Sequence, residues 1–237
     1  MATAAQAADN KLTLSGSATI ATDYMFRSVS NTDQRPAVQP EFDLTYGMFY
    51  ATIWGSNVDF GAVDGHDIGT VELDYYAGIA PKWKDVTFNL EALYYTYPGA
   101  CEGKCGLNEL DYFEASSGAT WAVNSQLSLG VHDWWSPNTF GQLGNSNAVE
   151  GAIGYAISGK LFNFFTPSVS SVIGYQWEET LPSYTYWNAG VTLGFMDHWS
   201  ADVRYYDTNL SSNECFAFSG FRNNCDARVV GAIKASF

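Results

Sequence analysis

The chain closes with the stretch "ARVVGAIKASF", residues 227–237, whose residues alternate in character up to the last one. One set is apolar and consists of Val229, Gly231, Ile233, Ala235 and Phe237. The other set includes two cations, Arg228 and Lys234. A period of two places the sets on opposite faces of a strand. Because the last residues of a soluble domain usually fray, a strand that reaches the final Phe237 indicates that something covers its apolar face.

The same period-two pattern recurs along the chain and predicts about twelve strands. They lie near residues 12–27, 36–46, 48–58, 69–80, 86–97, 110–122, 125–135, 147–157, 167–177, 184–196, 198–206 and 227–237. In the second strand, for example, Phe42 lies between Glu41 and Asp43. The third strand alternates poorly, so the pattern does not assign its faces. No stretch shows the period of an amphipathic helix.

The connections between these strands alternate strictly between short and long. The short ones fall at Gly47, 81–85, 123–124, 158–166 and Asp197. The long ones fall near 28–35, 59–68, 98–109, 136–146, 178–183 and 207–226. With an even number of strands, both chain ends then lie on the side of the short turns.

Two architectures give alternating strands, a soluble β-sandwich or barrel and a membrane barrel. Strands of soluble proteins are mostly five or six residues long, whereas about ten residues are needed to cross a bilayer at a tilt. The polar face carries acids and bases, which would make a poor dry core. A membrane barrel turns its apolar face to lipid and must close on itself. We therefore predict an all-β fold, a transmembrane antiparallel up-and-down β-barrel of about twelve strands over residues 11–237.

Aromatic residues gather at both ends of the predicted strands, as in the interfacial belts of membrane barrels. The belt on the long-loop side is predicted to contain Tyr24, Phe26, Tyr94, Trp135, Trp177, Trp187 and Tyr205. The belt on the short-turn side is predicted to contain Tyr46, Phe49, Trp121, Phe195, Trp199 and Phe237. The alternative interpretation is a set of aromatic residues scattered through a soluble β core.

The composition limits the partners of the protein. Charged residues make up 15% and aromatic residues 16% of the chain, a balance that argues against disorder. The 25 acidic residues against 11 basic ones give a formal net charge of −14. Nucleic-acid binding requires clustered Lys and Arg, so we exclude it. An acidic surplus concentrated in one place would instead attract cations.

Residues 1–10 read "MATAAQAADN", in which Ala5-Gln6-Ala7 resembles the cleavage site of a secretory signal. We expect either the remnant of a leader or an Ala-rich disordered tail. Export would place the cysteines in an oxidising compartment. Two local disulfides are then expected, Cys101 with Cys105 and Cys215 with Cys225. The three His are dispersed along the chain, so we expect no metal site and no cofactor.

Several stretches together resemble the TorF-type porins of proteobacteria, a family first catalogued as conserved proteins of unknown function. They are "ATDYMFRSVSNTDQRPAVQPEFDL", "YATIWGSNVDF", "VELDYYAGI", "LEALYYTYPGA", "RYYDTN" and the closing "KASF". The resemblance covers nearly the whole chain and is strongest over residues 15–100. It implies a barrel in the outer membrane of a Gram-negative bacterium, in contact with lipid and lipopolysaccharide. Phe237 also resembles the C-terminal signal that such barrels present to their assembly machinery.

An apolar outer face would direct the charged set into the lumen, the interior of the barrel. The predicted lining consists of Asp23, Arg27, Glu41, Asp43, Glu72, Asp74, Glu91, Glu114, His132, Glu150, Asp202, Arg204, Arg228 and Lys234. Its acidic excess predicts a narrow channel for small polar solutes that prefers cations. The four cations are expected to form a basic stripe on adjoining strands. The alternative is a plugged barrel with a structural or adhesive role, in which acids and bases pair across the interior.

The loop 207–226 is the longest, and its cysteine-closed part holds three aromatic residues, Phe216, Phe218 and Phe221. We expect it either to fold inward and constrict the mouth or to pack on neighbouring loops. The loop with Asp59, Asp64 and Asp67 lacks the spacing of a calcium site. A lipid-acting barrel enzyme is a third interpretation. His132 and two serines share one face, but they form no triad by themselves, so we predict no enzymatic activity.

Overall fold

The structure, a computed structural model, describes residues 11–237 and consists of one closed antiparallel β-barrel of 12 long strands. The strands are β1 (Leu12–Ala21), β4 (Ala37–Tyr46), β5 (Phe49–Asn57), β8 (Val71–Ile79), β10 (Val86–Thr96), β11 (Tyr112–Ala122), β12 (Leu127–Ser136), β13 (Ser146–Ala156), β14 (Thr166–Glu178), β15 (Tyr184–Phe195), β16 (Trp199–Thr208) and β17 (Arg228–Ser236). Each pairs with its neighbour in the chain, which confirms the predicted up-and-down order. The predicted leader remnant, residues 1–10, lies outside the described residues.

The last strand closes the barrel by pairing with the first. Ala18 is opposite Ala235 and Ile20 is opposite Ile233 in the antiparallel register of β1 and β17. The backbone of Phe237 continues this pairing, since Gly16 and Phe237 exchange N–H···O bonds of 2.8 and 2.9 Å. Every strand thus has two partners, and no sheet edge meets the membrane.

The outer face of the barrel is apolar because alternate residues of each strand point outward. Val229 and Phe237 of the closing stretch are 66% and 70% exposed. Other strands contribute exposed Leu14, Phe42, Ile53, Leu90, Val131, Ile153, Ile173 and Val203. A continuous apolar outer band of this kind is the lipid-facing surface of a transmembrane barrel.

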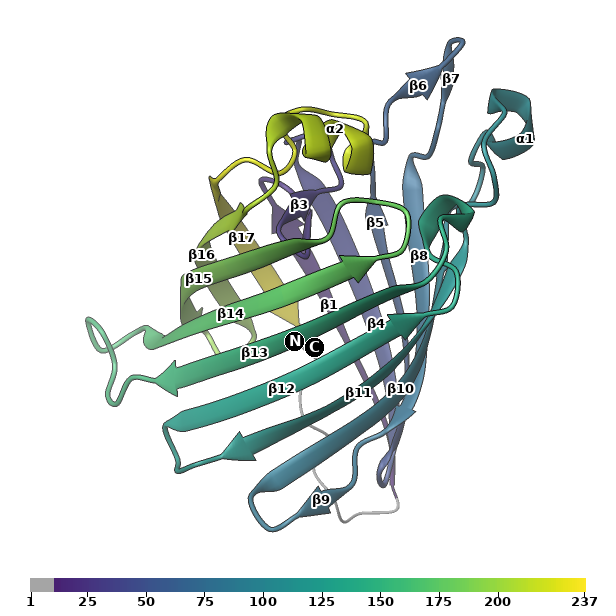
Figure 1. Cartoon of the computed structure of the whole chain (residues 1–237). Helices are drawn as coiled ribbons and strands as arrows, with labels where there is room; N and C mark the ends of the chain where they lie inside the picture. The colour runs from purple at the N-terminus through teal and green to yellow at the C-terminus, as the bar shows by residue number, and fades with distance from the viewer. Residues whose placement is uncertain (1–10) are drawn as a thin grey trace.

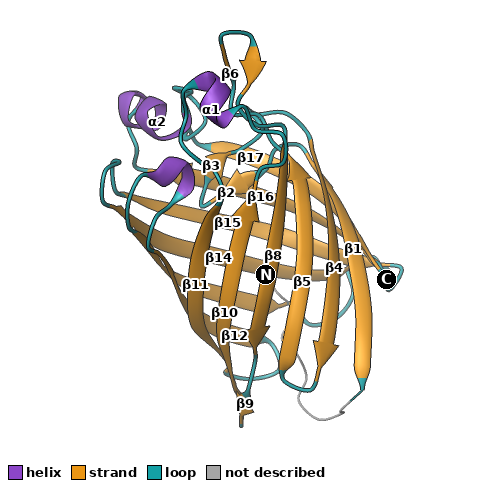
Figure 2. Ribbon diagram, turned by 90° about the vertical axis from the view of Figure 1, so that its right-hand side faces the viewer, coloured by secondary structure: helices purple, strands orange, loops and turns teal. Residues whose placement is uncertain are grey.

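The two ends of the barrel differ (Figures 1 and 2). The long loops carry α1 (Glu102–Cys105), α2 (Ser212–Ser219), the short η1 (Phe140–Gln142) and the projecting hairpin β6 (Ala62–Val63) with β7 (His66–Asp67). The other end has the short turns, one of which contains β9 (Lys82–Trp83). No helix in the described part of the chain is long and apolar enough to cross a membrane.

The first predicted strand is too long, because β1 ends at Ala21 and the chain then turns into the lumen. Residues 22–36, called here the inward loop, include the short hairpin β2 (Met25–Phe26) and β3 (Val29–Ser30). The expected positions of Tyr24 and Phe26 in the lipid belt are therefore wrong. Tyr24 is buried in an interior aromatic cluster, and Phe26 packs against the same cluster.

The poor alternation of the third predicted strand has a simple cause. In β5 the residues Phe49 and Ile53 point outward and are exposed, whereas Tyr50 and Trp54 point inward. Large aromatic side chains therefore occupy both faces, and the contrast between apolar and polar sets disappears. Trp54 packs on Tyr24 with 5.2 Å between the ring centroids.

Candidate functional site: the barrel lumen

The inward loop crosses the lumen from wall to wall. Arg27 donates two hydrogen bonds to the Glu114 carboxylate on β11, of 3.0 and 2.9 Å. On another wall, the Ser28 hydroxyl donates to the Trp187 carbonyl on β15 at 3.0 Å. The side chains of Arg27 and Glu114 are 8% and 1% exposed, so this ion pair is sheltered from water. The Arg27 guanidinium also lies over the rings of Phe26 and Trp134.

A polar cluster holds the base of the inward loop at the seam between first and last strands. The Asp23 carboxylate accepts hydrogen bonds from the hydroxyls of Ser30 and Thr32, at 2.7 and 2.8 Å. It also forms an ion pair with Arg228 of β17 at 2.8 Å. These charge-assisted bonds tie the loop to the barrel seam.

One half of the lumen is filled. Tyr95 and Tyr112 stack with 4.4 Å between ring centroids, beside Tyr24, Tyr97 and Leu110. Glu72 and Asp74 of β8 lie on this side, and each is 1% exposed. Burial and then the Glu72 carboxylate raise the pKa of Tyr24 well above its ordinary value, so Tyr24 remains a donor to Glu72. No solute path is expected through this half.

The other half contains a cavity of about 630 Å³. Its lining extends from Gln126 and Ala156, near the short turns, to Arg27 and Ser28 of the inward loop. Small residues line much of its wall, namely Ser128, Gly154, Ser168, Ser170 and Thr192. The charged residues of the lining are Arg27, Glu150, Asp202 and Arg204. This cavity is the candidate route for solutes.

Large inward side chains lie flat against the wall because each faces a glycine on a neighbouring strand. We call these cross-strand pairs glycine seats, and they are Tyr50 with Gly78, His132 with Gly118, Tyr186 with Gly174, and Arg204 with Gly190. A Cβ added to Gly174 would lie 2.6 Å from Tyr186 Oη, and one added to Gly190 would lie 2.9 Å from Arg204 Cζ. Larger residues at these glycines would displace the side chains into the lumen.

Every lumenal cation is paired with a carboxylate. The pairs are Arg27–Glu114 at 2.9 Å, Arg204–Asp202 at 3.2 Å, Arg228–Asp23 at 2.8 Å and Lys234–Glu41 at 3.3 Å. Arg204, Arg228 and Lys234 lie on the adjoining strands β16 and β17 as predicted, but Arg27 departs from the predicted stripe and crosses the lumen to β11. The sequence pattern did not show which acid pairs with which cation, because three of these pairs join residues 87 or more positions apart.

A second set of inward carboxylates has no cationic group of the described residues within the 4.0 Å ion-pair distance. Its members are Asp43, Glu72, Asp74, Glu91, Glu150 and Glu178. Neutral groups hold several of them: Tyr50 donates to Glu91 at 2.6 Å, and Thr52 donates to Asp43 at 2.7 Å. Glu72 and Asp74 belong to the filled half and Glu178 is buried, so the half-buried members are Asp43, Glu91 and Glu150, of which Glu150 lines the cavity.

His132, the remaining residue of the predicted lining, packs within the wall. Its ring stacks on Trp134 with 5.5 Å between centroids and leans over Gly118 on β11. Its cross-strand neighbour on the other side is Glu150 on β13.

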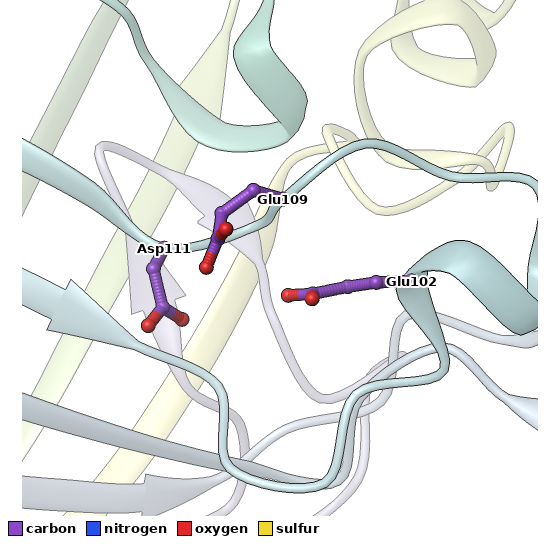
Figure 3. Close-up of side chains that lie close together, drawn as sticks. All are labelled: Glu102, Glu109 and Asp111. Atoms are coloured by element: carbon purple, nitrogen blue, oxygen red, sulfur yellow. The ribbon is translucent and has the colours of Figure 1, made fainter.

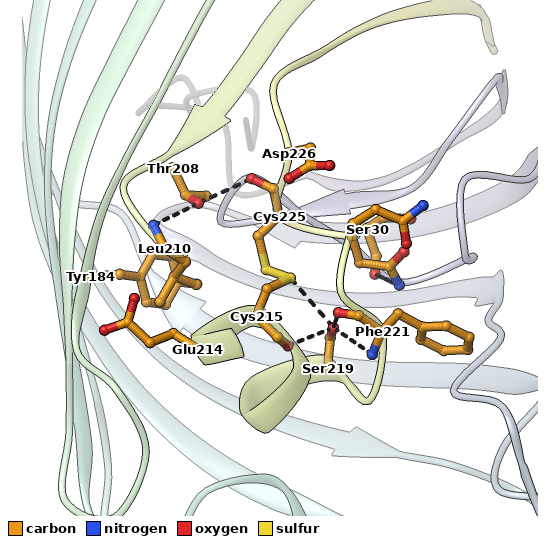
Figure 4. Close-up of a disulfide and its surroundings, with 12 residues drawn as sticks. Ser30, Tyr184, Thr208, Leu210, Glu214, Cys215, Ser219, Phe221, Cys225 and Asp226 are labelled. Carbon is orange, nitrogen blue, oxygen red and sulfur yellow. Dashed lines mark hydrogen bonds between the residues drawn. A yellow bond between two sulfur atoms is a disulfide. The ribbon is translucent and has the colours of Figure 1, made fainter. Parts of the chain in front are cut away.

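The loop 209–227, called here the cap, covers the inward loop. The Cys215–Cys225 disulfide closes it (Figure 4). The helix α2 begins with a capping box of Ser211 and Glu214. Hydrogen bonds from Ser211 lower the pKa of Glu214. The Ser30 backbone N–H donates to the Asn224 carbonyl at 2.9 Å, and the Asn224 amide donates back to the Ser30 carbonyl at 3.2 Å. The cap and the inward loop are thus joined by a pair of hydrogen bonds.

The three phenylalanines of the cap lie in different surroundings. Phe218 packs on Tyr184 with 5.2 Å between centroids, Phe221 lies against Gly61 of a neighbouring loop, and Phe216 is exposed beside Arg222. Both predicted arrangements are partly present, because Phe221 packs on a neighbouring loop and Phe218 packs on the buried Tyr184, and a constricting role of the cap stays a prediction. The segment that enters the lumen is the inward loop, which the sequence pattern did not single out.

Reduction of the disulfides should loosen the cap and leave the barrel intact. Both disulfides lie in long loops, and the second, Cys101–Cys105, closes the turn of α1. Hydrogen exchange should therefore increase in residues 209–227 after reduction, because the cap loses a covalent constraint. The difference in gel mobility between heated and unheated protein should remain. Loss of that difference would contradict this assignment.

Three carboxylates on the loop between β10 and β11 lie close together, those of Glu102, Glu109 and Asp111 (Figure 3). Their nearest oxygens lie within 4.8 Å of one another. Two of these carboxylates already accept hydrogen bonds from the backbone. The Leu110 N–H donates to Glu102, and the Tyr97 N–H donates to Asp111. The sequence did not indicate this cluster, because its members are separated by several residues of loop.

The architecture and lumen define a class: a porin-like transmembrane β-barrel of 12 strands. The chain belongs to the Gcw_chp family, described as a bacterial protein of unknown function, whose family model matches residues 5–237. A sequence search among curated proteins gives no match. The narrower resemblance to TorF-type porins stays a prediction.

Solved porins share the fold. The KdgM porin superposes with a TM-score of 0.61 at 8% identity, covering 94% of this chain and 99% of KdgM. The KdgM porin in complex with disordered oligogalacturonate gives the same values. The NanC porin superposes with a TM-score of 0.53 at 10% identity, covering 94% of this chain and 98% of NanC. At such low identities the likeness concerns the fold.

Proposed function

We propose that the protein is a channel of the outer membrane of Gram-negative bacteria, through which small polar solutes diffuse passively, with cations preferred over anions. The main supporting observation is that the half-buried carboxylates Asp43, Glu91 and Glu150 have no cationic partner among the described residues, whereas both arginines of the cavity are paired with acids. In a confined lumen with low-dielectric walls, such charge raises the local concentration of cations. The cavity of about 630 Å³ supplies space for a solute on one side of the lumen.

The apolar outer surface and the long loops indicate which membrane components the channel would contact. The apolar band would contact outer-membrane lipid, and the long loops would contact lipopolysaccharide. Phe237 projects at the end of the closing strand, where its ring covers Gly16. We propose that this exposed ring is what the barrel-assembly machinery recognises.

A planar-bilayer recording tests the proposal. Purified protein should give discrete current steps, and a salt gradient should give a reversal potential of the sign expected for cation preference. The physical reason is the surplus of unpaired lumenal carboxylates. A reversal potential of the opposite sign would refute the charge preference.

One observation favours a second candidate, a plugged barrel with a structural or adhesive role. The inward loop and the cap cover the end of the barrel that carries the long loops. In that case the wild type should give no current steps, whereas a variant with a dislodged inward loop should give them. Current steps from the wild type would exclude the plug.

A further inference from the structure

We infer that Glu150 is the anchor of a binding site for a small organic cation, an amine that also carries hydroxyl groups. The site lies in the lumenal cavity beneath the inward loop. The inference rests on the proposed channel function and specifies its solute.

The cavity offers no receptor for an anion, because its two arginines are occupied. Arg27 directs both terminal nitrogens to Glu114. Arg204 donates to Asp202 through Nε and Nη2, to Asn188 at 2.8 Å and to the Ser170 hydroxyl at 2.8 Å. A carboxylate or phosphate solute would have to break these bonds before it could bind.

Glu150 offers the reverse, a carboxylate that is fixed in position and still has an available oxygen. Its Oε1 accepts a hydrogen bond of 2.8 Å from the Tyr186 hydroxyl, and Tyr186 is held in place by its seat on Gly174. No group of the described chain donates to the other oxygen, Oε2. Glu150 is half-buried and lines the cavity, so its carboxylate is accessible from the solute route. His132 is directly opposite Glu150 on β12, and its ring lies over Gly118 and stacks on Trp134.

The rest of the cavity suits hydroxyl groups on the same solute. Ser128 and Ser168 present hydroxyls from two strands, and Thr192, whose hydroxyl donates to Asp202 at 2.6 Å, can still accept a hydrogen bond. Ser28 closes the cavity from the inward loop. An ammonium group paired with Glu150 makes a charge-assisted hydrogen bond. Hydroxyls on the same solute would exchange their water contacts for these side chains.

Three sugars of one ring size and different charge test the inference: glucosamine, glucose and glucuronate. In a planar bilayer, each is added until it halves the open-channel current, at a mildly acidic pH that keeps the amine protonated. Glucosamine should act at the lowest concentration and glucuronate at the highest. Glu150→Gln should raise the glucosamine concentration about tenfold, since a neutral amide makes a weaker bond to an ammonium. The response to glucose should not change.

Glu179→Gln is the matched control, because Glu179 is an exposed acid on an outer loop and lies outside the cavity. It should respond to all three sugars as the wild type does. An unchanged glucosamine response in Glu150→Gln, or no preference for glucosamine in the wild type, would overturn the inference and leave the channel function standing. A wild type that shows no current and admits none of the sugars into liposomes would overturn the channel function, and the inference with it.

Discussion

Arg27→Met should increase the channel conductance and destabilise the barrel in the same variant. The side chain bridges from the inward loop to β11, and its loss leaves the Glu114 carboxylate buried without a cation. Breaking a buried pair by removing one partner typically costs about 3–5 kcal/mol of the free energy of unfolding. The inward loop loses its contact with that wall, so it should move and widen the path. Single-channel recordings and a urea titration followed by gel mobility measure the two effects.

Two further variants separate the causes. Arg27→Met combined with Glu114→Gln removes the uncompensated charge, so much of the stability should return while the higher conductance persists. Arg35→Met is the matched control in the same loop, because the Arg35 side chain is 66% exposed and pairs with Asp33 and Asp59 at the surface. Exposed pairs contribute about 0–1 kcal/mol, so this variant should resemble the wild type. If Arg27→Met keeps the wild-type conductance, the inward loop does not limit the path.

Gly174→Ala should reduce the conductance. The added methyl group would lie 2.6 Å from the Tyr186 Oη, closer than van der Waals contact permits. Tyr186 would leave its seat, project into the cavity and lose its hydrogen bond to Glu150. Insertion of one methyl group into such a tight contact costs about 1–3 kcal/mol of stability.

Gly130→Ala is the control for this prediction. Gly130 is also an inward-facing glycine, on β12, but the nearest atom to its added Cβ would be the Ala152 Cβ at 3.5 Å. That is an ordinary contact, so conductance and stability should both be close to those of the wild type. A similar fall of conductance in both variants would argue against the glycine seats.

The strands and their order were predictable from the sequence because lipid and water impose opposite demands on alternate residues. The apolar set of the closing stretch faces outward as predicted, and Arg228 and Lys234 face inward. The signal is local: each strand shows it within about ten residues. Pairing of β17 with β1 then follows, since an open edge in lipid would leave backbone groups unpaired.

The inward loop was not predictable in the same way. Tyr24 and Phe26 continue the alternation of β1, so the pattern does not show that the strand ends at Ala21. The run of turn-forming residues from Ser28 to Asp33 was the available signal. The decisive contact, from Arg27 to Glu114, joins residues 87 positions apart. The glycine seats depend on cross-strand register, which one sequence does not specify.

The ion pair between Asp23 and Arg228 has a consequence for the order of assembly. Asp23 follows the first strand of the chain, whereas Arg228 is the first residue of the last strand. The base of the inward loop therefore cannot be completed until the final strand has been delivered and joined to β1. A barrel that still lacks its last strand would have a loosely held inward loop, so completion of the seam and fastening of the inward loop are one event.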